Sequence, residues 1–163
     1  MTVKNEISIK PAGFNDIPVL VLHYHKMFKE IYGLQKIKIN KKEFNEMYKN
    51  YREKLRVELK NGICKAWILK KSNKILASGA ISIISMVPVL NDPSCKVAYL
   101  HSIYTEKKAR GKGFAKQIVK KTIDYCKSEG IKRIILNTSG EGKSLYEKIG
   151  FQKSDNSMRF LVK

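Results

Sequence analysis

Apolar residues recur along the chain with two periods, one typical of strands and one typical of helices. Runs that alternate or are rich in β-branched side chains predict strands. In chain order these strands are Ile7–Ile9, Cys64–Leu69, Ile75–Ile84, Val97–Thr105, Ile131–Asn137 and Met158–Val162. Ser72 and Asn73 stand between the second and third runs, where they predict a hairpin turn.

Apolar residues spaced three and four apart predict helices between these strands. The expected helices are Asp16–Gly33, Asn40–Asn61, Phe114–Ser128 and Gly142–Ile149. Asn15 is expected to cap the first helix, and Asn40 with Glu43 resembles a capping box for the second. Because hairpin strands come first and a strand–helix–strand unit follows, the sequence predicts an α+β fold in one domain over residues 1–163.

Composition and cysteine usage narrow the class of protein. No apolar signal core follows Met1–Glu6, and the longest apolar run near the N-terminus, Val19–Leu22, is too short to cross a bilayer. We therefore expect a cytoplasmic protein without a membrane partner. Three widely spaced cysteines without a Cys-x-x-Cys pair, and only three histidines, argue against a disulfide framework and against a metal site.

The formal net charge of +19 favours an anionic partner: nucleic acid, an acidic membrane surface or a phosphate-rich cofactor. The lysines are scattered along the chain, and no basic tail or known nucleic-acid motif stands out. Binding to DNA or RNA is therefore expected to be nonspecific. The charge supports an anionic ligand but does not identify it.

A glycine turn, Lys108–Ala115, connects the strand Val97–Thr105 to the following helix. Two glycines at such a junction can leave the first amides of the helix uncovered, and these amides together with the helix dipole suit a phosphate. Arg110 and Lys112 add positive charge beside them. The alternative is a tight turn whose glycines only relieve steric strain. The turn fits neither the P-loop pattern nor the complete three-glycine dinucleotide pattern.

Two motifs together resemble the GCN5-related N-acetyltransferase family. Arg110-Gly111-Lys112-Gly113-Phe114-Ala115 matches the family's phosphate motif, Gln/Arg-x-x-Gly-x-Gly/Ala. Leu145-Tyr146-Glu147-Lys148-Ile149-Gly150-Phe151 is similar to its Leu-Tyr-x-x-x-Gly-Phe signature. The resemblance is specific over about Tyr99–Phe151, and it rests only on the order of elements before that.

The resemblance implies a central mixed, mostly antiparallel sheet flanked by about four helices, with acetyl-CoA as cosubstrate and no metal. In the family, a bulge splays the strand before the turn and opens a V-shaped gap for acetyl-CoA. The residues then expected to bind it are Ile103, Tyr104, Thr105, Arg110, Gly111, Lys112, Gly113, Phe114, Ala115, Lys116, Asn137 and Ser139. Lys107, Lys108 and Lys143 are either contacts for its 3′-phosphate or solvated surface residues.

The resemblance also assigns catalytic roles. Tyr146 matches the tyrosine that protonates the departing thiolate as general acid; the alternative is a core aromatic residue. A backbone N–H near Ile103 would stabilise the developing oxyanion. Some members carry a glutamate near the position of Tyr99, and His101 is a candidate base in its place or a packed, hydrogen-bonded histidine. Ser139 replaces an asparagine common in the family.

The expected function is direct transfer of an acetyl group to a primary amine on a small molecule or a peptide. No cysteine lies in either motif, which argues against an acyl-cysteine route. The acceptor is expected between residues 28–42 and 86–96, and no carboxylate cluster indicates a polyamine or an aminoglycoside. The alternative is a CoA-binding sensor of the same fold with little catalysis. Monomer and homodimer both stay open.

Overall fold

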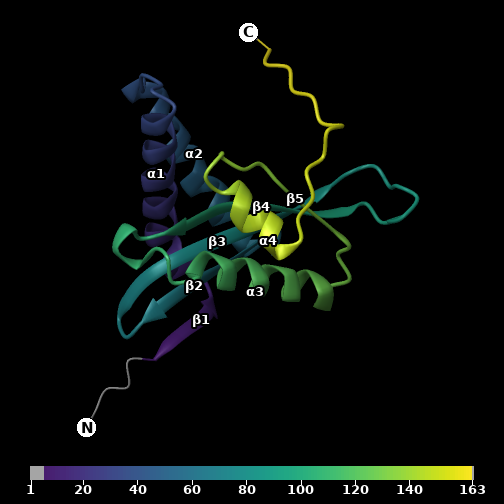
Figure 1. Ribbon diagram of the computed structural model, residues 1–163, viewed down its shortest axis with the longest axis horizontal. Coiled ribbons are helices and arrows are strands. Elements are labelled where there is room, and N and C mark those ends of the chain that lie inside the picture. Colours follow the sequence, from purple (N-terminus) through teal and green to yellow (C-terminus); the bar gives the residue numbers. More distant parts are fainter. Residues whose placement is uncertain (1–5, 163) are drawn as a thin grey trace.

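The computed structural model describes residues 6–162, which form a five-stranded sheet with helices on both faces (Figure 1). The strands are β1 (Ile7–Pro11), β2 (Cys64–Lys71), β3 (Lys74–Ser85), β4 (Lys96–Thr105) and β5 (Arg133–Leu136). The helices are α1 (Ile17–Leu34), α2 (Lys41–Lys60), α3 (Phe114–Ser128) and α4 (Lys143–Ile149), with short 3-10 turns at Phe14–Asp16 and Lys107–Ala109.

The sheet has the strand order β1-β2-β3-β4-β5, antiparallel except for the parallel pair β4–β5. Alternation in β2 places Cys64, Ala66 and Ile68 against α1 and α2, and Trp67 and Leu69 against α3 on the other face. The expected mixed, mostly antiparallel sheet with four flanking helices is therefore confirmed for the described part of the chain.

A bulge interrupts β4 where the resemblance led us to expect one. Ser78 pairs with Tyr104 and Ala80 pairs with His101, so two residues of β4, Ser102 and Ile103, lie opposite the single residue Gly79. Ser102 has a φ of 58°, in the left-handed region that a non-glycine residue rarely adopts. The bulge turns the second half of β4 out of register with its first half.

Beyond the bulge, β4 leaves one edge without a strand. β5 pairs only with Val97–Leu100, whereas β4 continues to Thr105 and then enters the glycine turn. Within residues 6–162, no strand pairs with positions 101–105 on the side of β5. We refer to the side of β4 beyond this pairing, toward the segment that follows β5, as the gap; from here β4 leads into the turn before α3.

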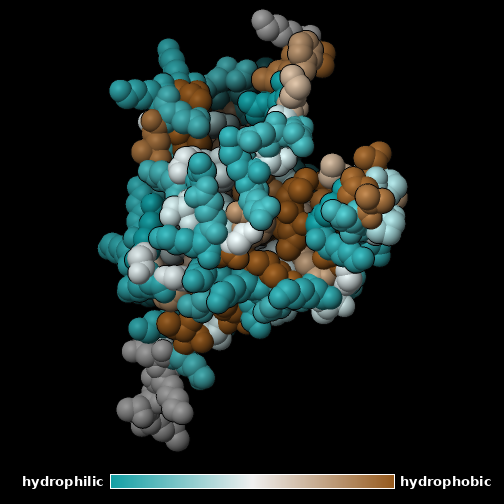
Figure 2. All heavy atoms as spheres, turned by 45° about the vertical axis from the view of Figure 1, so that its right-hand side comes forward, coloured by the Kyte–Doolittle hydropathy of each residue, from teal (hydrophilic) through white to brown (hydrophobic). Residues whose placement is uncertain are grey.

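The sequence expectations for the ends of elements are partly wrong. The predicted closing strand Met158–Val162 is not formed: Met158 is 98% exposed and Phe160 is 87% exposed, and Figure 2 shows apolar side chains at the outer end of this segment. An alternating pattern forms a strand only when a partner edge is within reach. Asp16, not Asn15, precedes α1, because Phe14–Asp16 forms a 3-10 turn. Asn40 does cap α2, accepting hydrogen bonds from two backbone amides.

Candidate functional site

Gly111 and Gly113 give the turn before α3 its shape. Their φ angles are 76° and 75°, a conformation that glycine adopts without a steric penalty. A Cβ atom at either position would meet no atom within 4 Å, so the space above the turn is open. Gly113 is the N-cap of α3 and has no side chain that could cover the first turn of the helix.

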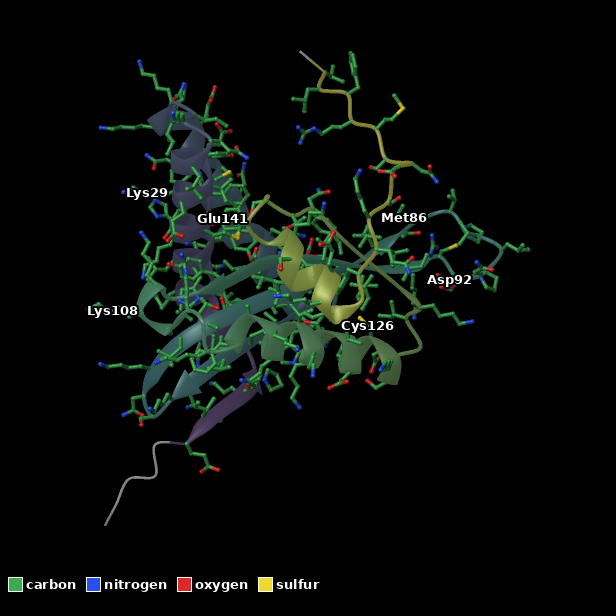
Figure 3. The ribbon with its side chains drawn as sticks, in the orientation of Figure 1. Lys29, Met86, Asp92, Lys108, Cys126 and Glu141 are labelled. Atoms are coloured by element: carbon green, nitrogen blue, oxygen red, sulfur yellow. The ribbon has the colours of Figure 1, made fainter. Side chains whose placement is uncertain are left out.

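The amides of residues 111–116 lie in this turn and in the first turn of α3. In the described part of the chain, none of them donates to a backbone carbonyl or a side chain. The positive end of the α3 dipole adds to their attraction for an anion. Lys108 lies on the turn between β4 and α3 at the edge of the molecule (Figure 3). The arrangement fits a pyrophosphate group.

The Arg110 side chain is held by protein groups on the outside of the turn. Its Nη2 lies 2.7 Å from a carboxylate oxygen of Glu30 on α1, and its Nε donates to the Thr105 carbonyl at 3.1 Å. Its guanidinium also lies over the Tyr104 ring, 5.6 Å from the centroid. Lys107 lies 3.7 Å from the same carboxylate. Arg110 therefore joins the turn to α1, and its charge is already paired.

The second half of β4 can offer mainly its backbone to a ligand. The Ile103 side chain packs where a Cβ on Gly79 would stand, and Tyr104 is buried against the His23 ring at 4.9 Å. The hydroxyl oxygen of Thr105 is buried and has no hydrogen-bond partner among residues 6–162. The atom has almost no accessible surface, so the backbone of β4 beyond the bulge is what can form hydrogen bonds with a ligand at this edge.

Phe114 and Ala115 differ in what they expose. Phe114 is 5% exposed and belongs to the core under α3, so it can contact a ligand only through its amide. Ala115 is half-buried, and Lys112 is exposed. Lys116 is exposed as well. The cradle is thus built from backbone amides, and lysine side chains surround it.

Tyr146 lies on α4, close to the loop that follows β5. Its ring packs edge-on against Phe151, with centroids 5.7 Å apart, and burial raises the pKa of its hydroxyl to about 12. The hydroxyl therefore keeps its proton at neutral pH. A Cβ on Gly142 would lie 3.3 Å from the Tyr146 ring and 2.6 Å from the Thr138 hydroxyl, so this glycine permits the close approach of the loop and the ring.

His101 lies at the bulge, and both of its ring nitrogens have partners. Its Nε2 is 3.1 Å from the Ser82 hydroxyl, and its Nδ1 is 2.9 Å from the Ser102 hydroxyl. Burial, reinforced by the Lys54 ammonium, lowers the pKa of His101 to about 4. The imidazole is therefore neutral at neutral pH and has a lone pair available.

Asn137 and Ser139 follow β5 on the opposite side of the gap. The Asn137 amide donates to the Tyr99 hydroxyl at 3.2 Å, and the Tyr99 ring stacks on His101 with centroids 5.8 Å apart. The carbonyl of Ser139 accepts from the Thr138 hydroxyl and from the Gly142 amide. Asn137 is thus joined to the His101 side of the gap, whereas Ser139 shapes the loop before α4.

An open pocket of about 630 Å³ lies along α2, and Tyr24 of α1 contributes to its lining. Its lining is polar and aromatic: Tyr24, Glu43, Glu46, Met47, Asn50, Tyr51 and Lys54. Tyr51 joins it to the bulge, because its ring meets the His101 ring edge-on at 6.1 Å. We had expected no grouping of carboxylates from the sequence, yet the first turns of α2 bring Glu43 and Glu46 to one cavity.

Several residues at the bulge were not found from the sequence. Ser82, Ser102 and Glu58 contact His101 directly or through one another, and none belongs to a recognisable motif. The only sequence signal is weak: Tyr51 and Glu58 are spaced so that they share one face of α2. Their contact with β3 and β4 depends on how α2 lies across the sheet.

Comparisons with known proteins agree with this geometry. The acetyltransferase (GNAT) family matches residues 26–151. Glucosamine 6-phosphate N-acetyltransferase of Arabidopsis thaliana is 32% identical over 88 residues, which are 53% of this chain and 56% of that protein. N-acetyltransferase 8B of Homo sapiens is 25% identical over 96 residues, 56% of this chain and 40% of that protein. The chain thus spans about half the length of the curated relatives it matches.

Solved structures share the whole architecture. A protein from Clostridium acetobutylicum, described as a predicted acetyltransferase with acetyl-CoA, has a TM-score of 0.82 and 25% identity over 96% of both chains. A GCN5-related N-acetyltransferase from Ralstonia eutropha JMP134 has a TM-score of 0.85 and 18% identity, covering 96% of this chain and 99% of that one. The second likeness concerns the fold alone.

Proposed function

Because the chain belongs to the acetyltransferase (GNAT) family, we propose that it transfers the acetyl group of acetyl-CoA to a primary amine. One observation carries the proposal: the unpaired edge of β4 beyond the bulge leads directly to the uncovered amides of residues 111–116. Such an edge can pair with an extended chain bearing amide groups, and the amides can hold a pyrophosphate. Acetyl-CoA has an extended pantetheine arm with amide groups, followed by a pyrophosphate.

Bound acetyl-CoA would supply the acetyl group in activated form, as a thioester. Gly111 to Lys116 bind and orient the pyrophosphate, and the backbone at Ile103 and Thr105 pairs with the pantetheine arm. The N–H of the chain near Ile103 stabilises negative charge on the carbonyl oxygen. Arg110 acts indirectly, because its pairing with Glu30 holds the turn against α1.

Tyr146 acts as general acid on the sulfur that leaves. Its pKa, raised to about 12 by burial, keeps the phenol protonated until a thiolate forms nearby. His101 acts as the base for the amine; burial lowers its pKa to about 4, so the imidazole is unprotonated at neutral pH but is a weaker base than a free histidine. The two groups come from α4 and from β4, on opposite sides of the gap.

The acceptor enters through the cavity that Tyr24 and Tyr51 line. Glu43 and Glu46 in its lining favour an amine that carries positive charge, and they are among only 14 acidic residues in a chain with 33 basic ones. The Arabidopsis relative named for glucosamine 6-phosphate makes that amino sugar a useful probe. Spermidine and a lysine-containing peptide complete a first panel of acceptors.

Amine-dependent release of CoA tests the proposal. Tyr146→Phe removes the proton donor, and we expect kcat to fall about 10²-fold with little change in acetyl-CoA affinity. Tyr125→Phe is the matched control. Tyr125 lies on α3, where its ring packs against Trp67 of β2, outside the gap. Binding of acetyl-CoA without release of CoA on any amine of the panel would instead favour a CoA sensor.

A further inference from the structure

A continuous series of hydrogen bonds runs from α2 through the sheet to the bulge. Ser82 on β3 donates to a carboxylate oxygen of Glu58 at 2.8 Å, and Ser82 is 3.1 Å from His101 Nε2. On the other side of the ring, Nδ1 is 2.9 Å from the Ser102 hydroxyl. Ser82 is 2% exposed, so water does not replace these partners.

The carboxylate at one end fixes the direction of every bond. Glu58 is paired with the Lys54 ammonium, and as a carboxylate it can only accept. The single proton of Ser82 therefore points to Glu58, and Ser82 must accept from His101. It follows that Nε2 carries the imidazole proton, that Nδ1 is the free base, and that Ser102 donates to Nδ1.

Neighbouring groups do not reverse this direction. Burial raises the pKa of the Cys64 thiol, which lies beside Ser82, to about 12, so it stays protonated and is a poor acceptor. Burial also raises the pKa of Tyr51, so its phenol keeps its proton and can donate to the neighbouring Ser102 hydroxyl while Ser102 donates to Nδ1. Lys54 and Tyr99 complete the titratable surroundings of His101.

We propose that Glu58 is a positioning residue for the transfer reaction: through Ser82 it holds His101 in the Nε2-protonated tautomer, so that Nδ1 receives the proton of the acceptor amine by way of the Ser102 hydroxyl. The inference rests on the proposed function for its chemical meaning, but the tautomer itself follows from the hydrogen bonds alone. Nothing in the phosphate cradle or in Tyr146 requires it.

The proton transfer balances. As the amine nitrogen forms its bond to the acetyl carbon, one N–H bond breaks and its electron pair stays on nitrogen. The proton passes to the Ser102 oxygen while the Ser102 proton passes to Nδ1, which gives an imidazolium whose Nε2–H points through Ser82 to Glu58. The C–S bond breaks with its electron pair on sulfur, and sulfur takes the Tyr146 proton. The imidazolium then loses a proton to water and Tyr146 regains one.

Glu58→Gln is the informative change, because the new side chain has nearly the same shape. The Lys54 ammonium attracts the amide oxygen, so the NH₂ group faces Ser82. Ser82 must then accept from the amide and donate to Nε2, which places the imidazole proton on Nδ1. Ser82→Ala removes the hydroxyl that connects Glu58 to His101. It is the substitute test if Glu58→Gln does not fold.

Nitrogen-15 NMR of the protein without ligands reads the tautomer directly. The His101 signals are assigned by their loss in His101→Gln, and protonated and unprotonated ring nitrogens resonate far apart. We expect Nε2–H in the unchanged protein and Nδ1–H in Glu58→Gln. Glu53→Gln is the control, because Glu53 lies exposed on α2, where it pairs with Arg56. In this variant the His101 tautomer should match that of the unchanged protein.

Kinetics then test whether the tautomer matters. With an amine from the panel that the protein acetylates, Glu58→Gln should lower kcat about 10²-fold and leave acetyl-CoA binding unchanged. In a His101→Gln background the same change should cost nothing further, because Glu58 acts only through His101. If Glu58 had a purely structural role, Glu58→Gln would lower kcat by the same factor with and without His101→Gln.

An Nδ1–H tautomer in the unchanged protein would overturn the inference, and so would full activity in Glu58→Gln. Either result would leave the transferase proposal intact if acetyl-CoA still binds and is turned over. Conversely, the protein could show the expected tautomers and yet bind no acetyl-CoA. That result would contradict the proposed function but would support the hydrogen-bond geometry.

Discussion

At the scale of single residues, burial sets the protonation states on which the chemistry depends. His101 and Tyr146 are both desolvated, and this keeps the imidazole neutral and the phenol protonated across the neutral range. Burial also lowers the pKa of His23, whose ring lies between Ser78 and Glu106. Each of these effects favours the uncharged form in the folded protein.

The lowered pKa of His101 predicts an acid-sensitive fold. Between pH 6.5, the ordinary value, and about 4, the unfolded chain binds a proton at His101 that the folded chain does not. The free energy of unfolding should therefore fall as pH decreases through this window, by up to about 1.4 kcal/mol per pH unit. His23 adds an effect of the same sign.

Urea unfolding at a series of pH values measures this dependence. His101→Gln has no titrating ring at this position, so its stability should vary less with pH between 6.5 and 4 than that of the unchanged protein. Equal slopes for the two proteins would mean that the imidazole is not desolvated in the fold. Carboxylates contribute mainly below this window.

At the scale of elements, the bulge in β4 depends on a missing side chain in β3. A Cβ on Gly79 would stand 2.3 Å from Ile103 Cδ1 and 2.7 Å from Ile118 Cγ2. Gly79→Ala should therefore push β4 or α3 outward and lower the free energy of unfolding by about 1–3 kcal/mol. It should also weaken acetyl-CoA binding, because the proposed site is formed by the end of β4 and the N-terminus of α3.

Gly33→Ala is the matched control for this change. A Cβ on Gly33 would meet nothing within 4 Å, and alanine is the better residue inside a helix. Chemical denaturation should show this variant equal to or more stable than the unchanged protein. If Gly79→Ala were equally harmless, the close packing of Ile103 under the bulge would be wrong.

The elements themselves could be predicted from the sequence, whereas their mutual contacts could not. Periodicity located every described strand and helix to within a few residues, because each buries one face in the core. The bulge at Ser102 has no local signal, since serine rarely adopts a positive φ and only the fold holds it there. Met158–Val162 shows the opposite error, a strand pattern that finds no partner.

In the candidate site too, local backbone features could be predicted from the sequence and contacts between distant residues could not. The conformation of the glycine turn was predictable, because Gly111 and Gly113 adopt positive φ angles that other residues rarely adopt. The pairing of Arg110 with Glu30 and of Ser82 with Glu58 was not, because each joins residues from elements distant in sequence. Side-chain partners of this kind follow from the packing of α1 and α2 on the sheet.

At the scale of the whole molecule, a net charge of +19 accompanies a proposed binding site made mostly of neutral amides. The charge should speed the approach of a polyanion such as acetyl-CoA, and salt screens this effect because the Debye length falls from about 30 Å at 0.01 M to about 3 Å at 1 M. The amides and the strand edge act at contact and are screened far less. Within residues 6–162, no helix is long and apolar enough to span a membrane.

Thermal unfolding with and without acetyl-CoA, at low and high salt, tests the central claim most directly. Acetyl-CoA at about a hundredfold its Kd adds about 2.7 kcal/mol, a rise in Tm of about 5–10 °C. We predict that a rise persists at high salt and that Gly111→Val abolishes it. Gly130→Val, which strains a glycine with a φ of 68° at the far end of α3, should retain it. No rise in Tm at either salt concentration would contradict the account, because the gap and the glycine turn would then not form a site for acetyl-CoA.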